Sequence, residues 1–303
     1  MKHSWKITAI LLVMFLVTQL IGLAVINSYV KEKLPYGMQP PEDIEPKFSL
    51  VSILIAFVMA IFLVLLLTKL KAAVFLRLWF FIVVVIAIGI TIQSFLSFSG
   101  IPYAMYLATL IALPLAFFKI FRQQLIVHNL TELMIYPGIA AVFVPILNVW
   151  TIIILLIVIS IYDMYAVWHS KFMQNMAKFQ INELKFFAGF FIPYIGKKDR
   201  VQLRQIKQKY KNKSSMEKAI KKKKIKANLA ILGGGDVIFP IIAAGIFLKA
   251  FGLLPALFVT LGATLALLSL FTLAKKGKFY PAMPFLTTGI FVGMLVGWLI
   301  SLI

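Results

Sequence analysis

The chain has 303 residues and no cysteine, which excludes disulfides, zinc-thiolate sites and cysteine nucleophiles. Hydrophobic residues make up 62% of it and its mean hydropathy is +0.97, well above the roughly 45 to 50% apolar usage of soluble domains. The net charge is +21. This composition excludes a soluble globular protein and predicts an all-α, polytopic membrane protein.

Nine apolar segments are long enough to cross a bilayer, since a spanning helix needs about 20 residues. We expect two parts, with five helices in residues 1–145 and four in residues 146–303. The nine predicted segments are 7–26, 50–68, 73–98, 103–118, 125–144, 146–169, 228–250, 253–273 and 281–302.

The distribution of Lys and Arg predicts the orientation, because short cytoplasmic loops are enriched in both. Lys2 and Lys6 precede the first segment, whereas the loop after it mixes Lys with several acids. We therefore expect a cytoplasmic amino terminus and, after nine crossings, a carboxyl terminus outside. The cell membrane is the expected location.

A basic polar insert, residues 170–226, separates the sixth and seventh segments. It holds seventeen Lys or Arg and three acidic residues, and so carries +14 of the net charge. A polybasic tract beside a membrane helix favours anionic lipid headgroups over nucleic acid, so we expect a cytoplasmic loop that binds lipid. Its aromatic stretch 181–196 is too short to span and is predicted to lie at the membrane interface.

Most acidic residues lie in polar loops, but three, Glu132, Asp163 and Asp236, fall within apolar segments. Glu132 is near the inner end of its segment, where a structural acid, either in the first turn or snorkelling, is expected. Asp163 and Asp236 lie deeper, and no Lys or Arg inside a predicted span could neutralise them. An intramembrane acid is costly and indicates a functional site.

The two aspartates are predicted to lie at one depth. Asp163 is roughly 9 Å from the cytoplasmic end of its helix and Asp236 roughly 12 Å from the same surface, at 1.5 Å per residue. Two adjacent carboxyls cannot easily both ionise, so such a pair holds one proton, as in aspartic proteases. One carboxylate can then activate water while its protonated partner donates to the developing oxyanion.

Three glycines precede Asp236, in the sequence ILGGGDVIFP. They serve close helix packing in the simplest interpretation. In the functional one, Gly233, Gly234 and Gly235 leave room for a partner helix, a water molecule and a substrate backbone. The stretch PAMPFL, residues 281–286, is explained equally well by the preference for proline in the first turn of a helix.

Together these segments resemble the presenilin and signal peptide peptidase family of intramembrane aspartyl proteases. ISIYDMYAVW (159–168) is similar to its tyrosine-aspartate segment, LGGGDVIFP (232–240) to its Gly-x-Gly-Asp segment, and PAMPFL to its Pro-Ala-Leu segment, with Met283 in place of Leu. The resemblance implies a presenilin-like fold, Asp163 and Asp236 as the catalytic pair, and transmembrane helices of other proteins as substrates. It also implies a group of substrate-positioning residues: Tyr162, Gly233, Gly234, Gly235, Pro281, Ala282 and Met283.

A proton-coupled transporter or channel would also require intramembrane acids, and it remains the alternative. It predicts inverted repeats or polar residues across the whole membrane thickness, and the sequence shows neither. A prepilin peptidase would resemble a pattern with Lys two residues after the aspartate, where this chain has Ile238. We expect neither a cofactor nor a metal ion.

Overall fold

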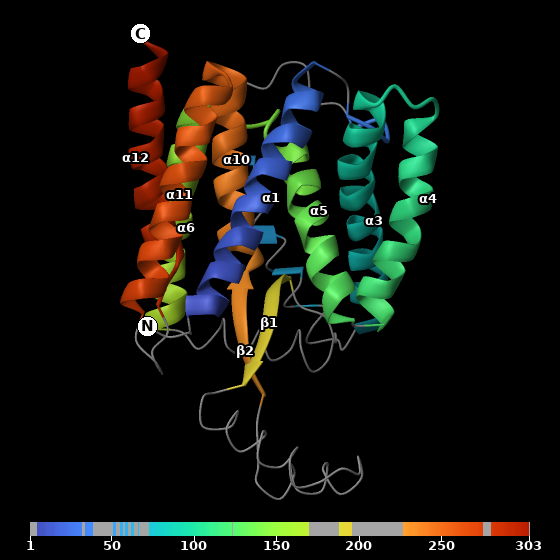
Figure 1. Cartoon of the computed structure of the whole chain (residues 1–303), viewed down its shortest axis with the longest axis horizontal. Coiled ribbons are helices and arrows are strands. Elements are labelled where there is room, and N and C mark those ends of the chain that lie inside the picture. The colour runs from blue at the N-terminus through green and yellow to red at the C-terminus, as the bar shows by residue number, and fades with distance from the viewer. Residues whose placement is uncertain are drawn as a thin grey trace, which may run out of the picture.

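The computed structural model describes residues 5–31, 34–38, 73–122, 124–169, 188–195, 227–274 and 280–302, together with single positions between 51 and 66. Its helices stand side by side, from α12 at one edge to α4 at the other (Figure 1). Eight of the described helices are long and apolar enough to cross a membrane. The second predicted segment, 50–68, falls largely outside the described residues, and the positions described there are helical.

The helices match most of the predicted segments. Their bounds are α1 Trp5–Lys31, α3 Ala73–Phe98, α4 Ala104–Phe117, α5 Leu125–Phe143, α6 Val149–Trp168, α10 Gly234–Phe251, α11 Leu253–Leu273 and α12 Met283–Ser301. A short π-helix, η1 Phe118–Arg122, extends α4. The expected boundary at residue 145 falls in the turn between α5 and α6.

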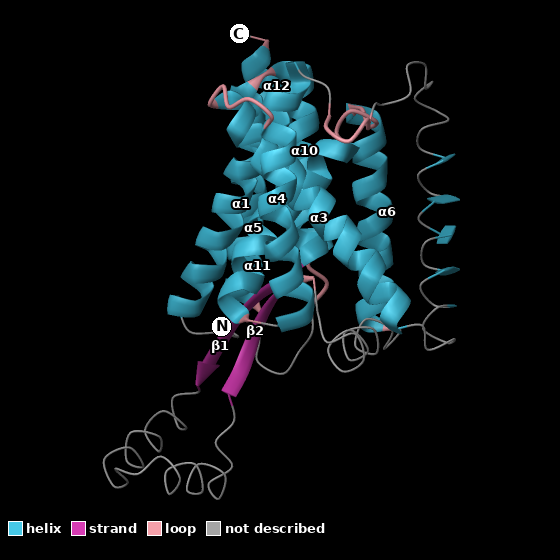
Figure 2. Cartoon of the chain, turned by 90° about the vertical axis from the view of Figure 1, so that its right-hand side faces the viewer, coloured by secondary structure: helices cyan, strands magenta, loops and turns pink. Residues whose placement is uncertain are grey.

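Two strands form the part of the fold that the sequence did not predict. Strand β1 (Gly189–Ile195) pairs antiparallel with β2 (Ala227–Gly233), and the hairpin projects from one end of the bundle (Figure 2). Residues 189–195 of the segment predicted to lie at the membrane interface, 181–196, form strand β1, and their interfacial location stays a prediction. The start of the seventh span at residue 228 is wrong, because α10 begins only at Gly234. Consecutive glycines are poor helix formers, and the preceding residues are hydrogen-bonded in the sheet.

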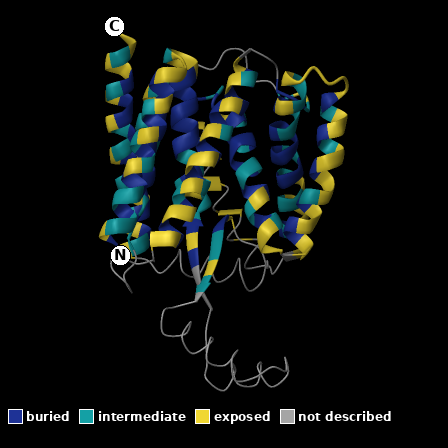
Figure 3. Cartoon of the chain, in the orientation of Figure 1, coloured by how far each residue is buried: buried dark blue, intermediate teal, exposed yellow. Residues whose placement is uncertain are grey.

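The helices bury one face against each other and expose the other (Figure 3). Apolar side chains such as Phe15 and Ile241 are fully buried, whereas Phe62 and Trp150 are exposed. Outward apolar side chains suit a lipid environment, since lipid chains are as apolar as the side chains themselves.

Helices α11 and α12 pack closely along a glycine stripe. Gly289, Gly293 and Gly297 recur every fourth residue of α12, and a Cβ at Gly297 would lie 2.8 Å from the Pro255 carbonyl oxygen. Small residues at this spacing let helix backbones approach in a membrane. The stripe fixes α12, and with it the residues at its amino-terminal end.

Candidate active site

The two intramembrane aspartates lie on helices that pack together, α6 and α10. Asp163 is in the last turns of α6 and its side chain is buried, with 7% exposed. Asp236 is the third residue of α10 and is half-buried. The two carboxyl groups lie within electrostatic range of each other, as the dyad requires.

Asp163 is held by the start of α12. Its Oδ2 accepts a hydrogen bond of 3.0 Å from the backbone N–H of Met283, and Ala282 N–H also faces this carboxyl. Met283 is the first residue of α12, and Pro284 after it has no N–H to offer. Asp163 therefore acts as an amino-terminal cap for a helix other than its own.

Asp236 lies at the amino-terminal end of its own helix, where its carboxyl group faces the backbone N–H of Gly233. The sequence predicts Asp236 about two turns into a helix, whereas the structure places it in the first turn of α10. Helix amino termini carry partial positive charge. Two of them, those of α10 and α12, converge on the aspartates and favour one negative charge shared by the pair.

The three glycines before Asp236 have different surroundings. A Cβ at Gly233 would lie 3.1 Å from Asp236 Oδ2, and one at Gly234 would lie 2.9 Å from the Tyr136 hydroxyl. Gly235 is exposed, and a Cβ there would meet only Phe239, at 3.8 Å. Gly233 and Gly234 therefore permit packing, whereas Gly235 keeps open the side of the helix next to the aspartate.

Further polar contacts fix the helices that carry the pair. One turn from Asp163, the hydroxyls of Ser160 and Thr287 lie 2.7 Å apart and join α6 to α12. Gln19 of α1 donates a 3.0 Å hydrogen bond to the carbonyl of Val237. Both hydrogen bonds are buried. Losing either would leave a buried polar group without its partner, which is costly.

The remaining residues expected to position substrate lie beside the pair but differ in exposure. Tyr162 is 38% exposed. Pro281 and Met283 are buried, and Ala282 between them is half-buried. The structure gives Ala282 and Met283 a contact with Asp163 through their backbones, and their contact with substrate stays a prediction.

A buried ionic cluster lies on the other side of the hairpin and was not predicted. Lys119 of η1 contacts Glu132 of α5 at 2.6 Å, and both side chains are at most 3% exposed. His128 completes the cluster. The expected snorkelling of Glu132 is therefore wrong, because Lys119, which lies between the predicted segments 103–118 and 125–144, is folded in to neutralise it. The structural role expected of Glu132 is compatible with this ion pair. The spacing of His128 and Glu132, four residues apart on one helix face, was the available signal.

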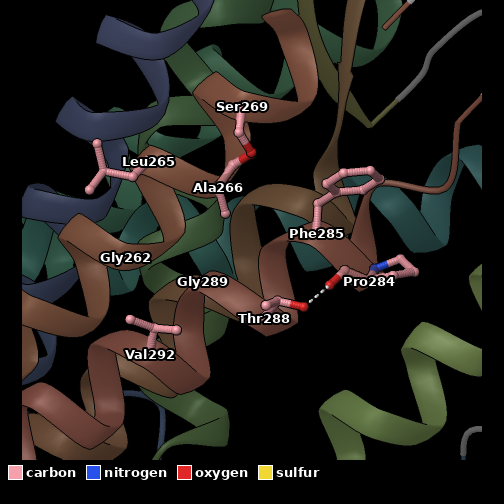
Figure 4. A pocket seen from close by; sticks show the side chains of 9 residues that line it. All are labelled: Gly262, Leu265, Ala266, Ser269, Pro284, Phe285, Thr288, Gly289 and Val292. Carbon is pink, nitrogen blue, oxygen red and sulfur yellow. Dashed lines mark hydrogen bonds between the residues drawn. The ribbon is translucent and has the colours of Figure 1, made fainter. Parts of the chain in front are cut away.

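A separate hollow of about 590 Å³ lies between α11 and α12. Its lining is mostly apolar, and its two hydroxyls are bonded within their own helices, Ser269 to Ala266 and Thr288 to Pro284 (Figure 4). The residues that line it are Gly262, Leu265, Ala266, Ser269, Pro284, Phe285, Thr288, Gly289 and Val292. None of these side chains can transfer a proton near neutral pH.

Comparisons with known proteins identify the family of the chain. The family model for signal-peptide peptidase and presenilin aspartyl proteases matches residues 12–303. Two solved structures of a presenilin family intramembrane aspartate protease, in the C222 and P2 space groups, have a similar fold. The first has a TM-score of 0.63 and 18% sequence identity, and the match covers 97% of this chain and 99% of that chain. The second has a TM-score of 0.59 and 18% sequence identity, and the match covers 96% of each chain.

A search of curated protein sequences finds no match. The family model covers nearly the whole chain and includes both aspartates, and nothing in these comparisons favours a transporter. The expected presenilin-like architecture has nine spanning helices, and the described residues contain eight; the second predicted segment lies largely outside them. The chain is a multi-pass membrane protein that belongs to the signal-peptide peptidase and presenilin family of aspartyl proteases.

Proposed function

We propose that Asp163 and Asp236 are the catalytic pair of an intramembrane protease that cleaves peptide bonds within transmembrane helices of other membrane proteins. The observation that carries this proposal is that both carboxyls, on two packed helices, lie at helix amino termini within electrostatic range. Such surroundings stabilise a single shared negative charge.

The singly ionised pair can perform both proton transfers of peptide hydrolysis. The ionised carboxyl takes a proton from water as the water oxygen attacks the peptide carbonyl carbon. The protonated carboxyl donates to the carbonyl oxygen as it becomes an oxyanion. The tetrahedral intermediate then collapses as its C–N bond breaks: the carboxyl that took the water proton gives it to the leaving nitrogen, and the other carboxyl takes a proton from a hydroxyl of the intermediate, which restores the singly ionised pair.

Strand β2 offers a place where an unwound substrate can bind. In the hairpin, Gly234 N–H bonds Ala188 carbonyl, and Phe191 bonds Asn129 of α5 through both backbone groups. By the alternation of an antiparallel ladder, the backbone groups of Ile231 and Gly233 point away from β1. The outer edge of β1 is occupied by α5, so an added strand would pair with β2.

The edge of β2 leads directly to the aspartate, since Asp236 faces the Gly233 N–H. A peptide bond in an intact helix is shielded, so the substrate must unwind near the scissile bond. Pairing with β2 supplies hydrogen bonds to the unwound segment, which would otherwise leave its backbone groups unsatisfied. The exposed flank at Gly235 leaves room for that segment.

The proposed orientation places the amino terminus in the cytoplasm and the carboxyl terminus outside, in the cell membrane. Its support is the Lys and Arg pattern and the opposite ends of the bundle at which α1 begins and α12 ends (Figure 1). In this orientation the basic segment 170–226 faces anionic lipid headgroups. A chiral cleft accepts a backbone in one direction, so substrates would have their amino termini outside.

The test is cleavage of a model transmembrane peptide by the purified protein in detergent. The parent should cleave, whereas Asp163→Asn and Asp236→Asn should each abolish cleavage. Asp199→Asn, in the basic segment, is the matched control and should cleave like the parent. A folded Asp163→Asn or Asp236→Asn variant with substantial activity would refute the proposal.

A further inference from the structure

The cluster formed by Lys119, His128 and Glu132 places three ionisable side chains inside the protein, each at most 8% exposed. Lys119 Nζ lies 2.6 Å from Glu132 Oε1 and 3.3 Å from His128 Nδ1. Charges removed from water are costly, and a buried ion pair commonly contributes little net stability. The cluster therefore requires an explanation other than stability of the bundle.

The hydrogen bonds of the cluster lead to one residue of the hairpin. His128 Nε2 lies 2.8 Å from the carbonyl oxygen of Gly189, and Gly189 N–H donates to Glu132 Oε1 at 3.3 Å. Lysine only donates and a carbonyl only accepts, so His128 carries its proton on Nε2 and accepts on Nδ1. Gly189 also has a φ of 153°, a conformation that residues with a Cβ rarely adopt.

Gly189 is the first residue of β1 and lies directly opposite Gly233 in the sheet. Gly233 is the residue whose backbone faces Asp236. Two hydrogen bonds between Asn129 and the backbone of Phe191 also hold β1 against α5, two residues after Gly189. The chain of contacts thus runs from the cluster through Gly189 and Gly233 to Asp236.

We infer that Lys119, His128 and Glu132 are positioning residues, which hold the hairpin against α5 and thereby set the position of Asp236. This inference rests on the proposed catalytic function of Asp236. The two contacts to Gly189 provide the positioning, and Lys119 neutralises the carboxylate that makes one of them. Loss of the cluster should therefore lower kcat more than it raises KM.

The test compares two double variants that differ in one contact. Lys119→Met/Glu132→Leu replaces the ion pair by apolar groups and removes the acceptor for Gly189 N–H. Lys119→Met/Glu132→Gln also removes both charges but keeps an acceptor oxygen there. We expect the first to lower kcat by about 10- to 100-fold, as for a displaced catalytic group, and the second to restore most of that loss.

Hydrogen exchange of the hairpin amides gives a readout that does not depend on catalysis. The exchange rates over 189–195 and 227–233 should rise in Lys119→Met/Glu132→Leu. They should return toward the parent level in Lys119→Met/Glu132→Gln and stay at the parent level in Lys249→Met. Lys249 is a control because it binds the Pro145 carbonyl, far from the hairpin along α10. His128→Phe, which keeps the stacking on Phe191 and loses the bond to Gly189, serves if a double variant fails to fold.

If Lys119→Met/Glu132→Leu and His128→Phe fold and the exchange of their hairpin amides is unchanged, the inference is overturned whatever their activity. Loosened strands with an unchanged kcat would also overturn it, because the link to Asp236 would be absent. If Asp236→Asn stayed active, the proposed function would fail, yet the exchange data would still report on whether the cluster holds the strands.

Discussion

Replacement of Gly235 by alanine tests whether the open flank beside Asp236 is catalytic space. The new Cβ would meet only Phe239 Cε2, at 3.8 Å, which is ordinary contact. Alanine is also a better helix former than glycine by about 1 kcal/mol in a helix interior. We therefore expect a folded Gly235→Ala protein that is as stable as the parent or up to about 1 kcal/mol more stable.

Activity should respond differently, because the added methyl group projects into the side of α10 on which substrate must lie. We expect kcat/KM to fall at least about tenfold, equivalent to about 1.4 kcal/mol of transition-state stabilisation. Gly234→Ala is the matched comparison. Its Cβ would lie 2.9 Å from the buried Tyr136 hydroxyl, so overpacking of about 1 to 3 kcal/mol should lower its stability as well.

Both quantities are measured on the same detergent preparations, by thermal unfolding and by initial rates of cleavage of a model transmembrane peptide. The expected pattern is loss of activity with retained stability for Gly235→Ala, and loss of both for Gly234→Ala. A Gly235→Ala protein that turns over like the parent would refute the assignment of catalytic space. Loss of stability in that variant would contradict the open surroundings of Gly235.

Two further predictions concern the pair and its support. Activity should fall on both sides of an optimum, since catalysis requires one shared proton; a pH-rate profile flat from about pH 4 to pH 9 would contradict this. Ser160→Ala should be about 1 kcal/mol less stable than Ser160→Ala/Thr287→Val, because it leaves a buried hydroxyl without its partner. Equal unfolding midpoints for the two proteins would show that the contact does not stabilise the bundle.

The helices and the acidic pair could be predicted because their signals are local. Runs of about 20 apolar residues identify spans, and an unpaired acid within such a run is costly enough to be conspicuous. Asp163 and Asp236 stood out by this reasoning. The start of α10 was misplaced because the apolar residues before Gly233 fit a strand as well as a helix, a distinction that hydropathy cannot make.

The hairpin and the ionic cluster depend on contacts between residues far apart in the chain. Strand β1 pairs with residues 32 to 44 positions later, from Ile195 with Ala227 to Gly189 with Gly233, so no short window of sequence contains both partners. Lys119 resembled a cytoplasmic loop residue because its charge marks orientation in the usual pattern. Only the fold of η1 against α5 shows that it neutralises Glu132 inside the protein.

The central claim is that two carboxyls act as one catalytic unit, and turnover of Asp163→Asn, Asp236→Asn and the double variant tests it most directly. Groups that act as a unit are not additive in their effects. The account predicts that each single variant loses as much kcat as the double variant, with all three proteins folded. Substantial turnover in one single variant, or losses that add in the double variant, would contradict a shared-proton pair.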